Sequence, residues 1–94
     1  MRDDDFEWDD AKARANIARH RVTFEMAREA LDDPFAVGWL DESERYGEDR
    51  YVALGMVEGR LLNVVYTMRD HRIRLISARG AEPWERRLYH GDNA

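Results

Sequence analysis

The sequence predicts a single α+β domain of two N-terminal helices, a four-stranded antiparallel sheet and a C-terminal helix. Its 94 residues have the length of one domain, and 44% of them are hydrophobic, which is enough for one packed core. Apolar residues recur at helical spacing in the first third of the chain. Residues 50–79 instead contain three segments rich in β-branched, leucine and tyrosine side chains, joined by two-residue turns.

Two helices are predicted before Pro34. Asp9 is placed to cap a helix that ends near His20, and Thr23 is the N-cap candidate of a second helix. Pro34 ends that second helix because the residue before a proline is disfavoured in the α region.

The sheet is predicted from four segments and two short turns. Glu58-Gly59 and Asp70-His71 are too short to connect parallel strands, so the hairpins are antiparallel. A polar loop, residues 41–49, follows the first strand. The predicted strands are Phe35 to Leu40, Arg50 to Val57, Arg60 to Arg69 and Arg72 to Arg79.

The last predicted element is a helix that begins at Pro83, a residue suited to the first helical position, and reaches Gly91. Residues 1–94 are therefore expected to form one domain. Residues 1–5 and 91–94 are expected to be flexible.

Composition excludes several classes of protein. The chain has no cysteine, so no disulfide, thiolate zinc site or cysteine nucleophile is predicted. Its glycines form no nucleotide-binding motif, and its three histidines have no metal-ligand spacing. We therefore expect no metal and no cofactor. The acidic start and the interruption of the longest apolar run by Asn63 indicate a cytoplasmic protein without a membrane span.

Charge is unevenly distributed along the chain. Residues 1–49 contain 7 Lys and Arg against 15 Asp and Glu, a net charge of −8. Residues 50–94 contain 8 against 5, a net charge of +3. The predicted sheet is thus the basic part of an acidic protein.

Alternation along the last two strands predicts a basic sheet face. In the last strand, Ile73, Leu75 and Ser77 alternate with Arg72, Arg74 and Ile76. An ordinary solvated sheet face is the alternative interpretation. If the polar faces of the two strands coincide, the basic face contains Arg69, Arg72 and Arg74, with Arg50 or Arg79 at strand ends and the polar Asn63 and Thr67.

Such a face suits RNA. Cleavage of RNA without a metal needs a base for the 2′-hydroxyl proton, a cation for the charge on phosphorus and an acid for the leaving 5′-oxygen. Arginines supply the cation. Spacing does not single out any of the candidates for the other roles, and each also has an ordinary structural explanation. These candidates are Lys12, His20, His71, Glu85, Tyr66 and Tyr89.

An ordered series of motifs runs over nearly the whole chain, from Phe6 to Tyr89. The series is Phe-Glu-Trp-Asp-x-Ala-Lys at 6–12, Asn16, His20, Val-Thr-Phe-Glu at 22–25, Asp-Asp-Pro at 32–34, Tyr-Gly-Glu-Asp-Arg-Tyr at 46–51, Ala-Leu-Gly at 53–55, Gly-Arg-Leu-Leu at 59–62, Val-Val-Tyr-Thr at 64–67, Arg-Ile-Arg-Leu-Ile-Ser-Ala-Arg at 72–79, Glu85, Arg86 and Tyr89. This series resembles that of BrnT toxins.

The resemblance implies a RelE-like ribonuclease toxin fold and growth arrest through RNA cleavage and inhibited translation. It also implies a BrnA-like ribbon-helix-helix antitoxin, in a heterotetramer that reaches operator DNA through the antitoxin. Carried onto this chain, it implies phosphate contact and charge stabilisation by Arg50, Arg69, Arg74 and Arg79, a proton acceptor in Lys12 or Glu85, assistance from His20 or Tyr89, and further RNA contacts from Arg72, Thr67 and Tyr89.

The chain departs from the pattern in two places. Met68 stands where many members have an acidic residue, and Gly80, Glu82 and Pro83-Trp84 replace a stretch that is usually basic or threonine-bearing. Two further hypotheses therefore stay open: a catalytically weak module that binds the antitoxin and regulates its operon, and an unrelated α+β interaction domain. Trp39, Leu40 and Trp84 are interpreted as core residues, with an antitoxin-binding surface as the alternative.

Overall fold

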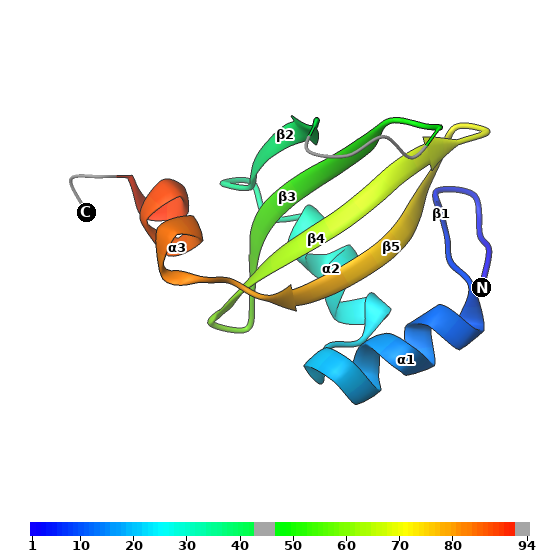
Figure 1. Cartoon of the computed structure of the whole chain (residues 1–94), viewed down its shortest axis with the longest axis horizontal. Coiled ribbons are helices and arrows are strands. Elements are labelled where there is room, and N and C mark those ends of the chain that lie inside the picture. Colours follow the sequence, from blue (N-terminus) through cyan, green and yellow to red (C-terminus); the bar gives the residue numbers. More distant parts are fainter. Residues whose placement is uncertain (43–46, 92–94) are drawn as a thin grey trace.

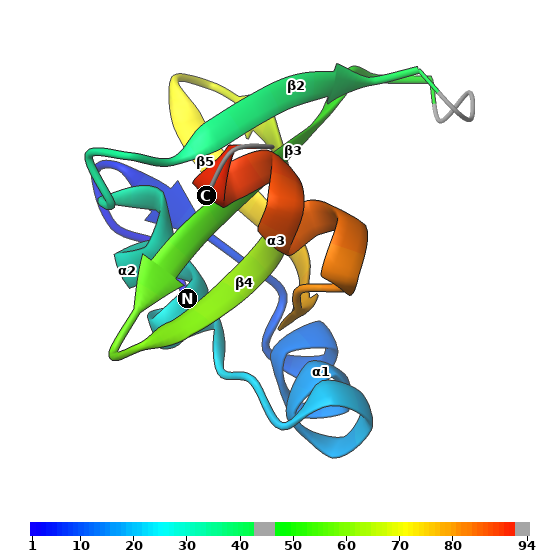
Figure 2. The ribbon, with the colours of Figure 1, turned by 90° about the vertical axis from the view of Figure 1, so that its left-hand side faces the viewer.

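The computed structural model describes residues 1–42 and 47–91, which form one sheet with helices on both faces (Figures 1 and 2). The elements in chain order are β1 (Phe6–Glu7), α1 (Asp10–His20), α2 (Phe24–Leu31), β2 (Val37–Asp41), β3 (Arg50–Val57), β4 (Arg60–Arg69), β5 (Arg72–Gly80) and α3 (Pro83–His90). The predicted α+β class and all three helices are confirmed. Residues 43–46 of the predicted loop and residues 92–94 of the predicted flexible end lie outside the described residues.

The sheet is mixed, so the prediction of four purely antiparallel strands was wrong. Five strands lie in the order β1-β5-β4-β3-β2, and β1 pairs in parallel with β5. Phe6 lies opposite Ile73, whose N–H donates to the carbonyl of Asp5 at 2.9 Å. A two-residue strand paired with a segment more than sixty residues later has no local alternation by which it can be predicted.

β2 begins at Val37, two residues later than predicted. A turn after α2 explains the difference. The Asp33 carboxylate accepts the N–H of Phe35 at 2.9 Å, and the Asp33 carbonyl accepts the N–H of Ala36 at 3.0 Å. Phe35 therefore lies in the turn, and its side chain is 76% exposed.

Side-chain caps begin the first two helices as predicted. The Asp9 carboxylate accepts the N–H of Lys12, and the Thr23 hydroxyl accepts the N–H of Met26, both at 3.0 Å. Each cap satisfies one of the unpaired N–H groups of a helix start. Among the described residues, no helix has the length and apolar character needed to cross a membrane.

The hydrophobic core fills the space between one sheet face and the helices α1 and α2. Trp8 and Phe24 pack edge to face with 5.7 Å between ring centroids. α3 lies on the opposite face, which leaves much of that face open (Figures 1 and 2). The core consists of Phe6, Trp8, Val22, Phe24, Ala27, Ala30, Val57, Leu62, Val64, Leu75 and Ala78.

A bulge in β5 changes which of its side chains share a face. Val65 pairs with Ser77 and the next residue, Tyr66, pairs with Leu75, so Ile76 is an additional residue. The predicted alternation placed Ser77 with Leu75 and away from Arg74. The bulge instead places Ser77 on the open face with Arg74, because the extra residue reverses the parity beyond it.

Both hairpin turns occur where predicted. Glu58 and Gly59 have φ angles of 49° and 78°, and Asp70 and His71 have φ angles of 51° and 67°. Positive φ at both central residues is typical of the type I′ turn, whose twist matches that of paired strands.

Close contact between α2 and β3 requires a glycine at position 55. A Cβ atom on Gly55 would lie 2.0 Å from the carbonyl oxygen of Ala30. We expect Gly55→Ala to lower the free energy of unfolding by about 1–3 kcal/mol, because the two backbones must separate. Urea denaturation measures this change.

Gly80→Ala is the matched control. Its Cβ would meet the mobile end of the Arg60 side chain at 3.3 Å, so we expect a change of less than about 0.5 kcal/mol. Equal stability of both variants would contradict the predicted backbone clash.

Candidate functional site

Two hollows adjoin on the surface, and Ser77 of β5 lines both. The first, which we call the α1 groove, lies between α1 and β5 and has a volume of about 220 Å³. Its lining residues are Lys12, Ala15, Asn16, Arg19, His20, Ile76 and Ser77. Two predicted site residues, Lys12 and His20, are therefore brought together.

The α1 groove gathers basic side chains that form no ion pair with a described acid. The charge of Lys12 does act on Asp9, whose pKa is lowered mainly by the hydrogen bond from the Lys12 backbone N–H and in part by that charge. The side chains of Lys12, Arg19 and His20 make no hydrogen bond or ion pair with another described residue. Positions 12, 16, 19 and 20 share one face of an α-helix. That spacing was the signal by which Arg19, absent from the predicted site, could have been found.

The second hollow, which we call the tryptophan pocket, lies between β2, the open sheet face and α3. Its volume is about 390 Å³. It is lined by Trp39, Asp41, Val52, Asn63, Val65, Ser77, Arg79, Trp84 and Glu85. Two predicted site residues, Arg79 and Glu85, line it.

Arg79 and Glu85 form an ion pair in the lining of this pocket, in which the carboxylate is buried and the Arg79 side chain is 34% exposed. Arg79 donates from Nη1 to Oε1 at 2.8 Å and from Nη2 to Oε2 at 3.1 Å. Glu85 is fully buried and also accepts the side-chain amide of Asn63 and the N–H of Glu82. Burial raises the pKa of Glu85, but the hydrogen bonds from Arg79, Glu82 and Asn63 outweigh it and hold the pKa below its ordinary value. A carboxylate held in this way fixes the direction of the Arg79 guanidinium.

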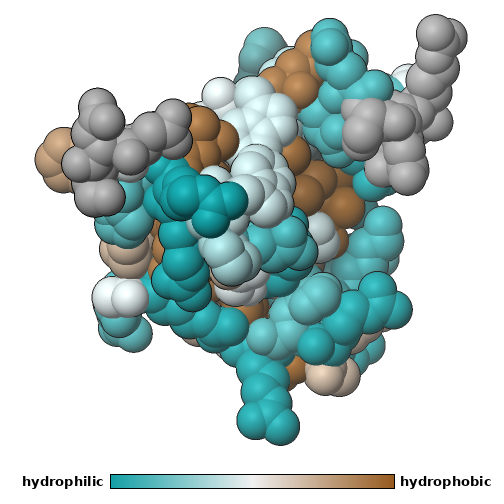
Figure 3. Space-filling view, turned by 60° about the vertical axis from the view of Figure 1, so that its left-hand side comes forward, coloured by the Kyte–Doolittle hydropathy of each residue, from teal (hydrophilic) through white to brown (hydrophobic). Residues whose placement is uncertain are grey.

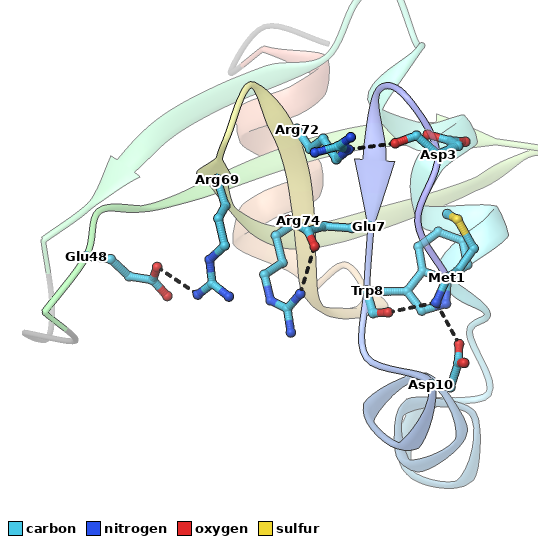
Figure 4. Close-up of polar contacts among 9 residues, drawn as sticks. All are labelled: Met1, Asp3, Glu7, Trp8, Asp10, Glu48, Arg69, Arg72 and Arg74. Atoms are coloured by element: carbon cyan, nitrogen blue, oxygen red, sulfur yellow. Dashed lines mark hydrogen bonds and ion pairs between the residues drawn. The ribbon is translucent and has the colours of Figure 1, made fainter.

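The other predicted arginines lie toward the far end of β4 and β5, and each has a partner (Figure 4). Arg69 contacts Glu48 at 3.3 Å, and Arg74 contacts Glu7 at 3.2 Å. Nε of Arg72 donates to the carbonyl of Asp3 at 2.7 Å. Register places Arg50 on the same face, opposite Asp41 of β2. The predicted arginines thus share one face, and Arg69, Arg74 and Arg79 are each paired with a carboxylate.

The remaining predicted residues lie apart from the two hollows. Thr67 is buried, and its hydroxyl donates to the carbonyl of Asp49 at 2.5 Å. The Tyr89 hydroxyl donates to the Asp33 carboxylate at 2.5 Å. That bond raises the pKa of Tyr89 and lowers the pKa of Asp33.

The interpretation of Leu40 and Trp84 as core residues was wrong. Their side chains are 41% and 47% exposed, whereas Trp39 is half-buried. Viewed from the side on which α3 lies, apolar surface is visible between polar side chains (Figure 3). Trp84 belongs to α3 and contacts Trp39 of β2, whereas Leu40 lies opposite Tyr51 of β3, on the other side of β2 from Trp39.

The α1 groove can bind a phosphate group and move a proton. Lys12 and Arg19 supply donors and positive charge, and an imidazole such as that of His20 is the commonest proton-transferring side chain in enzymes. Among residues 1–42 and 47–91, no three acidic or histidine side chains gather as ligands for a metal ion.

The Arg79–Glu85 pair predicts a pH dependence of stability. The folded pKa of Glu85 lies below that of the unfolded chain, so its contribution is complete above about pH 4.5 and is lost as pH falls through the folded value. We expect Glu85→Gln to cost roughly 1.5–3 kcal/mol at pH 7, and the difference from wild type to shrink toward pH 3. Glu29→Gln, at an exposed position on α2, is the control with an expected effect under about 0.5 kcal/mol. A difference that stays constant with pH would contradict this account.

Comparison with protein families gives a match that covers most of the chain. The model of a protein family described as the ribonuclease toxin BrnT of type II toxin–antitoxin systems matches residues 8–85. No curated protein gives a significant sequence match. The family match extends from Trp8 in the core through the α1 groove and strands β2 to β5 to Glu85 in α3. The chain therefore belongs to the BrnT family of ribonuclease toxins.

Proposed function

We propose that this chain is a metal-independent endoribonuclease that cuts RNA in the bacterial cytoplasm and so inhibits translation and growth. The observation that carries the proposal is the α1 groove, where Lys12, Arg19 and His20 converge without a partner among the described residues. In a protein of net charge −5, such a local cluster of cations is suited to a phosphate group. Membership in the BrnT family supports RNA as the source of that phosphate.

The geometry favours particular roles among the predicted residues. Lys12, rather than Glu85, is the proposed proton acceptor, because Glu85 is fully buried and already accepts four hydrogen bonds. His20, rather than Tyr89, is the proposed proton donor, because it lines the same groove as Lys12. In its neutral amine form, Lys12 removes the 2′-hydroxyl proton and becomes the ammonium that contacts the phosphate. The 2′-oxygen attacks phosphorus, the bond from phosphorus to the 5′-oxygen breaks, and His20 in its protonated form gives its proton to the leaving 5′-oxygen.

Arginines of the α1 groove and of the open face serve the same reaction in this proposal. Arg19 stabilises charge on phosphorus in the groove. Further RNA contacts are proposed for Arg50, Arg69, Arg72, Arg74, Arg79 and Tyr89. Thr67 is buried and bonded to the carbonyl of Asp49, so it positions its strand and does not contact RNA. Arginines that are already paired with carboxylates orient the RNA more than they add to its affinity. A phosphate must displace the carboxylate or share the arginine with it.

The proposed regulator is a BrnA-like antitoxin with a ribbon-helix-helix domain. A type II system has a protein antitoxin, which the family match implies. We propose a heterotetramer in which operator DNA is bound through the antitoxin alone. The toxin's net charge of −5 accords with a chain that does not itself bind duplex DNA.

A second candidate function is a catalytically weak module that binds the antitoxin and regulates the operon. The pairing of Arg69, Arg74 and Arg79 with carboxylates favours it, since paired arginines attract RNA less strongly. The two candidates differ in one measurable property, which is RNA cleavage by the α1 groove.

Induced expression in bacteria tests the nuclease. We expect the wild-type chain to arrest growth and degrade RNA on gels. We expect Lys12→Ala with His20→Ala to lower the cleavage rate of the purified protein by at least about 100-fold, the usual scale of acid–base catalysis. Neither side chain makes a hydrogen bond or ion pair with another described residue, so the circular dichroism spectrum should be unchanged.

Arg14→Ala is the matched control, because Arg14 is exposed on the same helix and does not line the groove. It should arrest growth like the wild type. Intact RNA in cells that contain abundant, folded wild-type protein would reject the nuclease and support the binding module.

The pair between Glu7 and Arg74 gives a further prediction. Both side chains are largely buried, at 14% and 23% exposure. Glu7→Gln should release Arg74 to a phosphate, which tightens RNA binding and steepens the dependence of log K on log salt by about 0.7 per added phosphate contact. Fluorescence anisotropy with a 2′-O-methyl RNA measures both quantities.

Glu25→Gln on α2 makes the same change in net charge at an exposed position away from the arginines. If it steepens the salt dependence as much as Glu7→Gln does, the effect arises from overall charge, and the role of Arg74 in binding phosphate is rejected.

A further inference from the structure

The tryptophan pocket has a size and lining that the cleavage reaction itself does not require. At about 390 Å³, it falls within the roughly 300–1,000 Å³ of small-molecule sites. Val52 and Val65 form part of its lining, and indole rings come from β2 and α3. The pocket thus combines two valines and two indole rings with polar side chains.

The two indoles are available and held in place. The rings of Trp39 and Trp84 have centroids 6.3 Å apart and are tilted by 48°. Trp84 is 47% exposed, and its Nε1 donates to the Glu82 carboxylate at 3.0 Å. That bond fixes the plane of an exposed ring, which lowers the entropy cost of stacking another ring on it.

The pocket adjoins the proposed phosphate site. Ser77 lines both the pocket and the α1 groove. An RNA strand whose phosphate occupies the groove therefore brings a neighbouring nucleotide over β5 toward the pocket. Unpaired bases in RNA are commonly recognised by stacking on aromatic side chains.

We infer that the tryptophan pocket binds one unpaired nucleobase of the RNA, stacked on Trp84, and that it prefers a purine. The larger purine ring system covers more of the indole. This inference rests on RNA being the substrate, as proposed above. It makes Trp84 a determinant of which nucleotide lies next to the cut.

An exposed aromatic pocket also suits a side chain of a protein partner. The polar lining favours the nucleobase. The lining includes hydroxyl, amide, guanidinium and carboxylate groups, which belong to Ser77, Asn63, Arg79, Asp41 and Glu85. Ser77 also lines the α1 groove. The antitoxin is the competing occupant in the experiment.

The experiment compares the binding of 2′-O-methyl hexaadenylate, 2′-O-methyl hexauridylate and an abasic oligomer with the same number of phosphates. The wild type is compared with two variants: Trp84→Leu, which keeps an apolar side chain, and Trp84→Phe, which keeps an aromatic ring. Leu88→Ala is the matched control, because Leu88 is 44% exposed on the same helix and does not line the pocket. Tryptophan fluorescence is recorded in each titration.

We expect Trp84→Leu to weaken hexaadenylate binding by roughly 5- to 150-fold, the fold-change that corresponds to stacking of one base. Trp84→Phe should retain most of the affinity, and Leu88→Ala should leave it unchanged. Hexaadenylate should bind more tightly than hexauridylate and quench tryptophan fluorescence. The abasic oligomer should bind equally to all variants.

Equal binding of hexaadenylate to the wild type and Trp84→Leu would overturn the inference. So would the same loss for the abasic oligomer, or a loss of antitoxin binding in Trp84→Leu with unchanged oligonucleotide affinity. If the protein binds a base on Trp84 but cuts no RNA, the proposed nuclease function is rejected and the base-binding pocket is retained. Cleavage with a nucleotide preference that Trp84→Leu does not alter would reject the base pocket alone.

Discussion

The buried side chain of Asn16 joins the two halves of the molecule. It donates to the carbonyls of Val22 and Ala78 at 2.9 and 2.8 Å and accepts the N–H of Ala78 at 3.1 Å. One amide thereby ties α1 to the link before α2 and, across 62 positions, to β5. An apolar side chain of similar size would leave three buried backbone groups unpaired. Because α1 and β5 are the walls of the α1 groove, its width depends on this one side chain.

The bulge at Ile76 is the second constraint on the site. Without the additional residue, Ser77 and Arg79 would face the core and Ala78 would face outward. With it, the small Ala78 packs in the core beside Asn16, and Arg79 reaches Glu85 of α3. Because of this bulge, Ser77 and Arg79 lie on the same face as Arg74, whereas in a regular strand they would lie on the other face.

The sequence predicts best those elements whose ends are determined by neighbouring residues. The helix caps, Asp9 and Thr23, and the two I′ turns lie next to the helices and strands whose ends they determine. These helices and strands are predicted correctly. The strand β1 and the bulge depend on partners at the other end of the chain, so alternation along the sequence cannot reveal them. Within the site, Lys12 and His20 are found through resemblance to a family, whereas the burial of Glu85 follows from the position of α3 and is visible in the fold alone.

The pairing of the arginines indicates that paired and unpaired basic residues have different roles on the surface. A guanidinium held by a buried carboxylate, as Arg79 is by Glu85, is fixed in direction but loses much of its attraction for phosphate. Lys12 and Arg19 keep their attraction because no described acid contacts them. An acidic protein can therefore bind RNA at one groove without attracting it over the whole surface. In such an arrangement the location of the unpaired cations, rather than the number of arginines, determines where the RNA backbone lies.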